Sequence, residues 1–302
     1  MQRFVKAMLH GELPSEPLFA PLLSTAVSKV VGIPPSQLFR NPTKLANGLR
    51  QLQGPLRCDV LDCCSDLTLL AEALGASLDW STGAPRVVAG PQGGPKPDEV
   101  VSSGRIPVVL EVIHRLRLTL RDRVALLLVL PGPLTLAMQL SANAEDVLEP
   151  ASRAILAVAR AACEAGSDII MFVEVQAVPA AVSGAWAASV ETIANVVRFH
   201  EALPVVMSPG VETATPGLDH LPTPWVLTVS QLVRPEFVAS NNLFGVALPP
   251  APILDPVPHE VMAALGRKEC VLLTTTGNIP DELEPRAVMP HMRALRALVT
   301  AT

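Results

Sequence analysis

Short runs of apolar residues recur along the chain, and each run ends in small or polar residues. The runs do not alternate with polar positions, which indicates strands that are buried on both faces, as in a parallel sheet. We predict eight strands from these runs: Glu16–Leu22, Arg57–Leu61, Val124–Leu130, Asp168–Val173, Leu203–Met207, Trp225–Val229, Phe244–Leu248 and Val271–Thr275.

Helical patterns lie between the predicted strands. The stretch from Pro150 to Gly166 has proline near its start and glycine just past its end, the usual punctuation of a helix. Further helices are predicted over Trp186–Glu201, Val257–Gly266 and Pro285–Thr300. Alternating strands and helices form right-handed βαβ units, and eight units close a barrel. We therefore predict one α/β domain over residues 1–302, a (β/α)8 TIM barrel, with a doubly wound open sheet as the alternative.

One stretch departs from this alternation, between Gly75 and Pro107. It is rich in Gly, Pro and Ser and is too long for an ordinary connection between a strand and a helix. We expect Asp79–Trp80 and Arg86–Val88 to pair as a small hairpin inserted after the second strand. Whether Gly90–Val101 acts as a lid over the barrel is left open by the sequence.

Composition narrows the class of protein. With 49% hydrophobic and 17% charged residues, the chain has enough apolar material for a large core without disulfides. A net charge of −5 and scattered basic residues argue against a nucleic-acid surface. No apolar window is long enough for a membrane span, and the first residues lack the apolar stretch of a signal peptide. We expect a cytoplasmic protein that acts on a small molecule.

Four segments near the ends of predicted strands carry recognisable motifs: Asp59–Asp66 followed by Leu69–Gly75, Leu130–Ala137, Ala165–Asp168 with Phe172 and Glu174, and Thr276–Pro280 followed by Glu284 and Pro285. Together, and in this order, they resemble the motifs of the uroporphyrinogen decarboxylase superfamily. The resemblance implies a barrel, often dimeric, so a homodimer is expected. It also implies one of two chemistries: decarboxylation of uroporphyrinogen without a cofactor, or methyl transfer to or from a corrinoid protein, a thiol or a folate.

Departures from the family pattern bear on the decarboxylase chemistry. The resemblance implies an arginine-rich opening segment, a tyrosine and a late histidine. Here Leu18–Ser24 contains no arginine, the chain has no tyrosine, and the late histidine position is Thr276. Only the aspartate survives, as Asp66. A substrate with many carboxylates needs arginine partners, so decarboxylation of uroporphyrinogen is not expected.

A second departure from the family pattern concerns the residues that bind zinc. Related zinc-dependent methyltransferases place histidine and cysteine ligands after the fifth strand, where this chain has Met207 and Pro209. We therefore expect no metal and no tightly bound cofactor. The leading hypothesis is a zinc-free methyltransferase or O-demethylase that moves a methyl group between a small methylated substrate or tetrahydrofolate and a separate corrinoid protein. The alternatives are a decarboxylase or lyase for a smaller carboxylate, and a non-catalytic ligand-binding subunit.

The candidate site lies where the strands end, because barrel enzymes place their chemistry there. Asp66 and Glu174 are the predicted catalytic residues, which would orient the substrate and handle the leaving-group proton. The alternatives are a helix cap for Asp66 and a salt bridge at the rim for Glu174. Predicted substrate-binding residues are Asp62, Gly132, Thr135, Gln176, Met207, Ser208, Ser230, Thr275 and Asn278.

Overall fold

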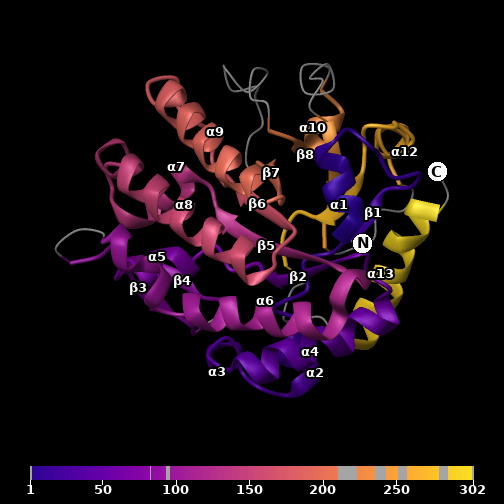
Figure 1. Ribbon diagram of the computed structural model, residues 1–302, viewed down its shortest axis with the longest axis horizontal. Helices are drawn as coiled ribbons and strands as arrows, with labels where there is room; N and C mark the ends of the chain where they lie inside the picture. The colour runs from indigo at the N-terminus through magenta and orange to yellow at the C-terminus, as the bar shows by residue number, and fades with distance from the viewer. Residues whose placement is uncertain are drawn as a thin grey trace.

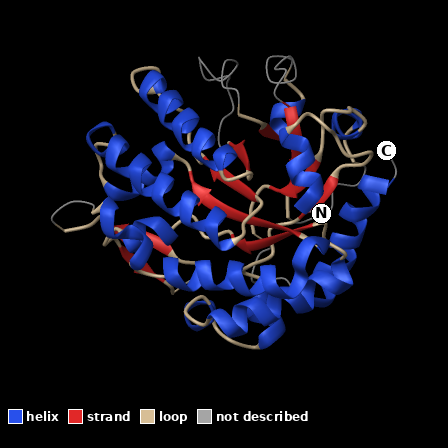
Figure 2. Cartoon of the chain, in the orientation of Figure 1, coloured by secondary structure: helices blue, strands red, loops and turns tan. Residues whose placement is uncertain are grey.

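Eight parallel strands form one sheet that curls into a nearly closed barrel (Figures 1 and 2). The computed structural model describes residues 2–81, 83–92, 96–209, 223–234, 243–250, 257–278 and 285–300. The barrel strands are β1 (Leu18–Ala20), β2 (Val60–Cys64), β5 (Ala125–Pro131), β6 (Ile169–Val173), β7 (Leu203–Met207), β8 (Trp225–Thr228), β9 (Leu243–Leu248) and β10 (Leu272–Thr275). Their order is β1-β10-β9-β8-β7-β6-β5-β2, which confirms the predicted (β/α)8 barrel.

The two end strands, β1 and β2, meet across the remaining seam. The backbone N–H of Asp59 donates to the carbonyl of Phe19 at 3.0 Å. The N–H of Phe19 in turn donates to the carboxylate of Asp59 at 2.9 Å. The carboxylate of Asp59 therefore accepts a hydrogen bond that a backbone carbonyl would accept in a regular ladder between the strands.

Helices surround the strands on the outside of the barrel (Figure 2). The α-helices are α1 (Gln2–Leu9), α2 (Val27–Val31), α3 (Pro35–Leu38), α4 (Pro42–Leu56), α5 (Leu69–Ala73), α6 (Ile106–Leu120), α7 (Pro133–Leu140), α8 (Leu148–Ala165), α9 (Ser183–Phe199), α10 (Val229–Leu232), α12 (His259–Leu265) and α13 (Pro285–Thr300). Short 3-10 helices are η1 (Pro97–Ser102), η2 (Arg121–Arg123) and η3 (Glu145–Val147). The four helices predicted from sequence are all present, and α8 ends at Gly166 with φ +111°, as its glycine indicated.

Alternate residues of each strand face two separate cores. In β5, Leu127 and Val129 belong to the core inside the barrel, whereas Leu126 and Leu128 belong to the core between strands and helices. This alternation follows from the two-residue period of a strand. Because both faces are buried, the strand sequences are continuously apolar.

The amino end of the barrel is closed by α1. Its Val5 and Met8 are buried within the inner core, together with strand residues such as Leu203. An ion pair between Lys6 and Glu201, which lies just before β7, holds the helix at this end. The inside of the barrel is therefore capped where the strands begin.

The segment after β2 forms the predicted hairpin. Strands β3 (Ser77–Asp79) and β4 (Arg86–Ala89) pair in antiparallel fashion. Further on, η1 packs beside α8, and Arg153 contacts Asp98 at 2.6 Å. Within the Gly90–Val101 stretch, residues 93–95 lie outside the described part of the chain.

The second strand lies later in the sequence than we predicted. Arg57 ends α4 with a left-handed φ of +51°, and β2 starts only at Val60. The prediction of Arg57–Leu61 was wrong because α4 continues through Leu56. As a consequence, Cys63 and Cys64 lie within the strand, and burial raises the pKa of both thiols.

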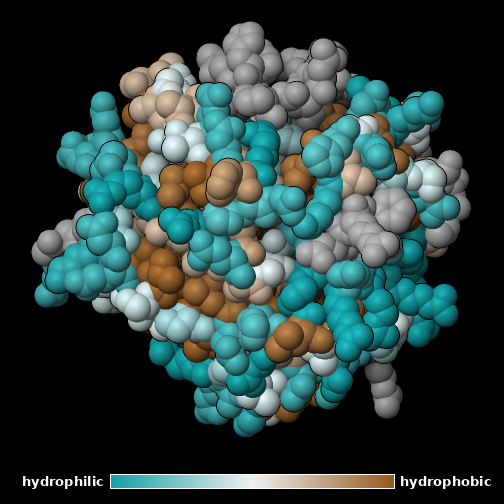
Figure 3. Space-filling model, viewed as in Figure 1, coloured by the Kyte–Doolittle hydropathy of each residue, from teal (hydrophilic) through white to brown (hydrophobic). Residues whose placement is uncertain are grey.

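The surface mixes hydrophilic side chains with apolar patches on the face shown in Figure 3. Within the described residues, no helix combines the length and the apolar character needed to cross a membrane.

Candidate active site

The carboxyl ends of the strands gather the polar side chains that sequence predicted. Asp62 lies in β2, Asp66 just after it, Glu174 directly after β6, and Thr275 at the end of β10. The segments 210–222, 235–242, 251–256 and 279–284, which follow β7 to β10, lie outside the described residues. The described part of the mouth therefore consists of the strand ends and the side formed by β1, β2, β5 and β6.

Glu174 is the centre of a buried hydrogen-bond network. Its Oε1 accepts the backbone N–H of Leu134 at 3.0 Å and the indole N–H of Trp186 at 2.6 Å. Its Oε2 accepts the backbone N–H of Thr135 at 2.8 Å and the hydroxyl of the same residue at 2.6 Å. The donors at Leu134 and Thr135 are otherwise free N–H groups at the start of α7. Glu174 therefore fixes the start of α7 and holds α9 against it.

Gly132 is required by this arrangement. A Cβ at Gly132 would lie 2.3 Å from the carboxyl carbon of Glu174. Thr135 completes the turn, because its hydroxyl also accepts the N–H of Val175 at 3.0 Å. Burial raises the pKa of Glu174, although the hydrogen bonds from Thr135, Trp186 and Leu134 oppose that rise. The rim salt bridge considered for Glu174 was wrong: its described partners are hydrogen-bond donors, not cations.

Asp66 is held by a different set of partners. Its Oδ1 accepts the N–H of Thr68 at 2.8 Å and the Thr68 hydroxyl at 2.7 Å. Its Oδ2 lies 2.6 Å from the guanidinium of Arg105, which is 1% exposed. Arg105 also pairs with Glu72 and stacks over Trp80, 4.8 Å from the ring centre. Asp66 thus combines a local turn with one buried ion pair.

Asp62 joins β1 to β2 near their carboxyl ends. Its Oδ2 accepts the backbone N–H groups of Leu23 and Ser24, each at 2.9 Å, and contacts the hydroxyl of Ser65 at 2.7 Å. Its Oδ1 is buried without a hydrogen-bond partner. Val60, two residues earlier, faces the inside of the barrel, so Asp62 faces the inside as well.

The last strand contributes to the same cluster. Asn278 accepts from the Ser65 hydroxyl at 2.5 Å and donates its own amide to the Ser65 carbonyl at 2.9 Å. Thr275 accepts the N–H of Leu22 at 3.1 Å and donates to the carbonyl of Gly277 at 2.8 Å. We call Asp62, Ser24, Ser65 and Asn278 the seam cluster. It unites the ends of three strands that are distant in sequence.

Four other predicted residues have different surroundings. Met207 is buried in the inner core of the barrel. Ser208 is buried, and its carbonyl accepts the side-chain amide of Gln231 at 2.8 Å. Ser230 is exposed, 3.0 Å from the hydroxyl of Thr228. Gln176 is exposed, because β6 ends at Val173 and the chain has left the strand before it, whereas Glu174 is buried.

Sequence reasoning missed four residues that complete these networks: Ser24, Ser65, Arg105 and Trp186. Ser24 and Ser65 follow the first and second strands and could have been found by the rule that predicted Asp66. Arg105 and Trp186 lie in or next to helices, and no local signal indicated that they approach strand ends. Among the described residues, no group of three or more His, Cys, Asp or Glu has the geometry of a metal site.

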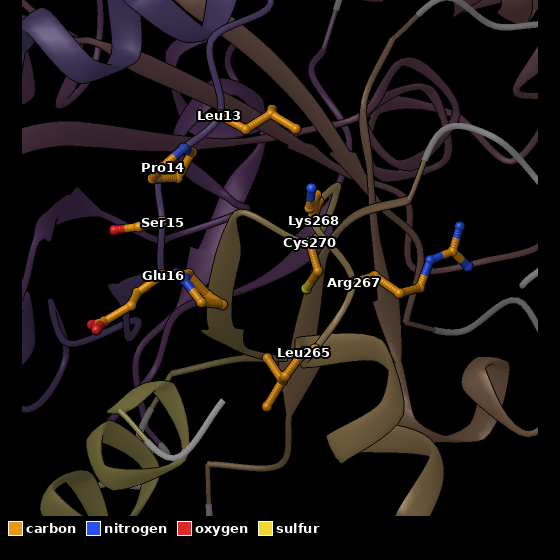
Figure 4. Close-up of a pocket in the computed structure, with 10 residues that line it drawn as sticks. Leu13, Pro14, Ser15, Glu16, Leu265, Arg267, Lys268 and Cys270 are labelled. Carbon is orange, nitrogen blue, oxygen red and sulfur yellow. The ribbon is translucent and has the colours of Figure 1, made fainter.

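A cavity of about 280 Å³ lies at the opposite, amino end of the barrel. It is lined on one side by Pro14, Ser15 and Glu16, which precede β1, and on the other by Lys268 and Cys270, which precede β10 (Figure 4). Barrel enzymes keep their chemistry at the carboxyl end, so this cavity belongs to the end associated with stability.

Comparisons with known proteins agree with the fold. The family model described as "Uroporphyrinogen decarboxylase (URO-D)" matches residues 1–185. A methyltransferase from Methanosarcina mazei has a similar structure, with a TM-score of 0.76 and 21% identity over 98% of this chain and 97% of that chain. A B12-independent methionine synthase from Shewanella sp. W3-18-1 has a TM-score of 0.58 and 18% identity over 86% of this chain and 87% of that one. No curated protein matches the chain in sequence.

Proposed function

Because the chain belongs to the uroporphyrinogen decarboxylase family, we propose that it is a methyl-transferring member of that family. It would move a methyl group between a small, uncharged or cationic substrate and a corrinoid carried by a separate protein. Tetrahydrofolate is the alternative methyl carrier. The observation that carries this proposal is the scarcity of lysine and arginine in the sequence segments that follow the strands.

Lysine and arginine are missing from most of the segments that directly follow the strands. This holds for the segments after β1, β2, β5, β6, β7, β9 and β10, which are 21–26, 65–68, 132–140, 174–182, 208–224, 249–258 and 276–284. A substrate with many carboxylates would need several arginine forks for paired, charge-assisted hydrogen bonds. The mouth is better suited to an uncharged or cationic methyl donor.

The buried cation nearest to Asp66 is already neutralised. Arg105 is paired with both Asp66 and Glu72, so its positive charge is matched before any substrate arrives. Recruiting Arg105 to a substrate carboxylate would leave two acidic side chains without their buried partner, which is costly. This argues against the decarboxylase alternative.

The likeness to the methyltransferase from Methanosarcina mazei supports methyl transfer over decarboxylation, since it extends over nearly the whole of both chains. Zinc does not fit the residues present. Met207 stands where related methyltransferases have a ligand, and the described residues lack a three-ligand group. Zinc therefore has no part in the proposed reaction.

Roles for the site residues follow from their contacts. Asp66 and Glu174 are positioning residues that hold the mouth in shape, and neither acts as a nucleophile. Asn278 and Ser65, which are nearer the mouth than the fully buried Asp62, would contact the methyl donor. Thr275, Ser208 and Ser230 would line the remaining side.

The test is a methyl-transfer assay with the full chain and free reduced cobalamin as acceptor. An aryl methyl ether, a methylamine and methyltetrahydrofolate serve as separate donors, and methylation of cobalt is followed by ultraviolet–visible spectroscopy. We expect methylation with at least one donor. Carbon dioxide release from small carboxylic acids, measured without cobalamin, would contradict the proposal if it occurred while no donor methylated cobalt.

A matched pair of variants tests the site. Asn278→Ala should lower kcat/KM by tenfold or more, equivalent to ~1.4 kcal/mol of transition-state stabilisation. Asn195→Ala changes an exposed residue of α9 and should leave kcat/KM unchanged. Equal rates for both variants would remove the seam cluster from the proposed site.

A further inference from the structure

The seam cluster contains more short oxygen–oxygen contacts than its hydroxyl hydrogens can fill. The hydroxyl of Ser65 lies 2.7 Å from Ser24 Oγ, 2.7 Å from Asp62 Oδ2 and 2.5 Å from Asn278 Oδ1. Each contact of this length needs a hydrogen between the two oxygens. Ser24 and Ser65 supply one hydroxyl hydrogen each, so three contacts share two hydrogens.

Asn278 does not supply the missing hydrogen. Its amide nitrogen donates to the carbonyl of Ser65 at 2.9 Å, which fixes Oδ1 toward the Ser65 hydroxyl as an acceptor. Reversing the amide would place its oxygen against that carbonyl, where neither atom has a hydrogen. The third hydrogen must therefore come from Asp62. With a proton on its carboxyl, Asp62 donates to Ser65, Ser65 donates to Asn278, and Ser24 donates to Ser65.

The second carboxyl oxygen of Asp62 leads to the same assignment. Oδ1 is buried without a hydrogen-bond partner, and the residue is 0% exposed. An ionised carboxylate would leave charge on this oxygen inside the barrel, without a cationic partner among the described residues. A buried charge of this kind is strongly unfavourable unless it is paired, whereas the carbonyl oxygen of a neutral acid is tolerated better.

Among the described residues no cationic side chain pairs with Asp62, and the backbone N–H groups of Leu23 and Ser24 are what favours its ionised form. On its own strand, Cys63 and Cys64 are thiols whose pKa is raised by burial, and so is the pKa of Cys58. From β1 and β10 it faces Ser24 and Asn278, which do not titrate in this range. Burial raises the pKa of Asp62 itself, and the backbone hydrogen bonds from Ser24 and Leu23 oppose that rise.

We infer that Asp62 is a neutral carboxylic acid at neutral pH, and that it stores the proton which Ser65 presents to a bound substrate. Asp62 is a positioning residue in this scheme, because Ser65 lies between it and the mouth. The protonation of Asp62 stands on the contacts alone. The delivery of its proton rests on the proposed function.

In an O-demethylation, the bond between the methyl carbon and the substrate oxygen breaks, and both electrons stay on oxygen. The nucleophile of the acceptor supplies the electron pair of the new bond to carbon. Ser65 passes its proton to the substrate oxygen and takes the proton of Asp62, so an alcohol leaves and Asp62 becomes a carboxylate. A proton from solvent then restores the acid.

Infrared spectroscopy of the full chain at neutral pH tests the protonation directly. We expect the wild type to absorb in the carbonyl region of protonated carboxyl groups, with a band that moves in D2O and is missing from Asp62→Asn. Asp59→Asn is the matched control, since Asp59 lies at the same seam but pairs with Arg296. The control should keep the band.

A wild-type spectrum that differs from Asp62→Asn only in the carboxylate region would overturn the inference. Ser65→Ala covers the case in which Asp62→Asn does not fold. It removes the hydroxyl that accepts from Asp62 and should shift the acid band to higher frequency, whereas an unshifted band would also overturn the inference. The carbonyl band of protonated Asp62 is measured without any reaction, so it would be present even if no methyl donor reacts. Its presence or absence therefore tests this inference separately from the proposed function.

Discussion

The indole N–H of Trp186 donates to the carboxylate of Glu174 across 2.6 Å, and both side chains are 1% exposed. Trp186 belongs to α9, whereas the other donors to Glu174 belong to the start of α7. One carboxylate therefore connects the end of β6 to two helices that lie beside each other in Figure 1. A group with four internal donors is suited to shaping the mouth of the barrel, and less to exchanging protons with a substrate.

Replacing Trp186 with Phe tests this structural role. The variant keeps an aromatic ring in the core but removes one donor, so we expect the free energy of unfolding to fall by about 1–2 kcal/mol. Urea unfolding followed by circular dichroism would measure the change. A variant as stable as the wild type would show that the indole N–H is dispensable.

Gly132→Ala should be more disruptive than its small size indicates. The new Cβ would lie 2.3 Å from the Glu174 carboxyl carbon, so the network must shift, at a cost of about 1–3 kcal/mol. Gly184→Ala is the control: it lies in the first turn of α9 with open space around it, and Ala should stabilise the helix by up to about 1 kcal/mol. Thermal unfolding of both variants compares them, and equal stability would contradict the close approach.

Arg105→Met should destabilise the fold strongly. Removing the buried guanidinium leaves Asp66 without its cation and Glu72 with only its exposed partner, at a cost of about 3–5 kcal/mol. Arg40 pairs with the same Glu72 at 3.0 Å but is exposed, so Arg40→Met should cost less than about 1 kcal/mol. If denaturant unfolding gave the two variants the same loss, the buried ion pair would not have the importance assigned to it.

Glu174 should also make stability depend on pH. Its pKa is raised by burial above the unfolded value of about 4.3. The folded state then binds the proton more tightly, so the contribution is fully present below the unfolded pKa and is lost as pH rises through the folded pKa. The difference in unfolding free energy between wild type and Glu174→Gln should therefore decrease as pH rises over that interval and then level off. A difference that increased with pH would show that the folded-state pKa is lowered instead.

The barrel could be predicted from sequence because its strands are apolar on both faces and its helices carry clear end signals. Pro150, for example, lies in the first turn of the helix found at Leu148–Ala165, and Gly166 directly follows that helix. The second strand was misplaced because the boundary depends on the backbone of Arg57, which takes a left-handed conformation that arginine seldom adopts.

The site could be predicted only in part. Asp62, Asp66, Glu174 and Asn278 were found because polar residues at strand ends are conspicuous in so apolar a chain. Their partners could not be assigned, since Ser24, Ser65 and Asn278 meet only when β1, β2 and β10 become neighbours. Arg105, which directly precedes α6, reaches Asp66 only through the packing of α6 in the folded chain. No local sequence pattern predicts this contact.

Helix α1 closes the amino end of the barrel, because its Val5 and Met8 are buried in the inner core. A reactant that contacts Ser65 and Asn278 would enter from the carboxyl end of the barrel and leave by the same side. Bound product would then block the entry of the next substrate. Product release is therefore a step that substitutions at the carboxyl end of the barrel could speed up or slow down without changing the amino end.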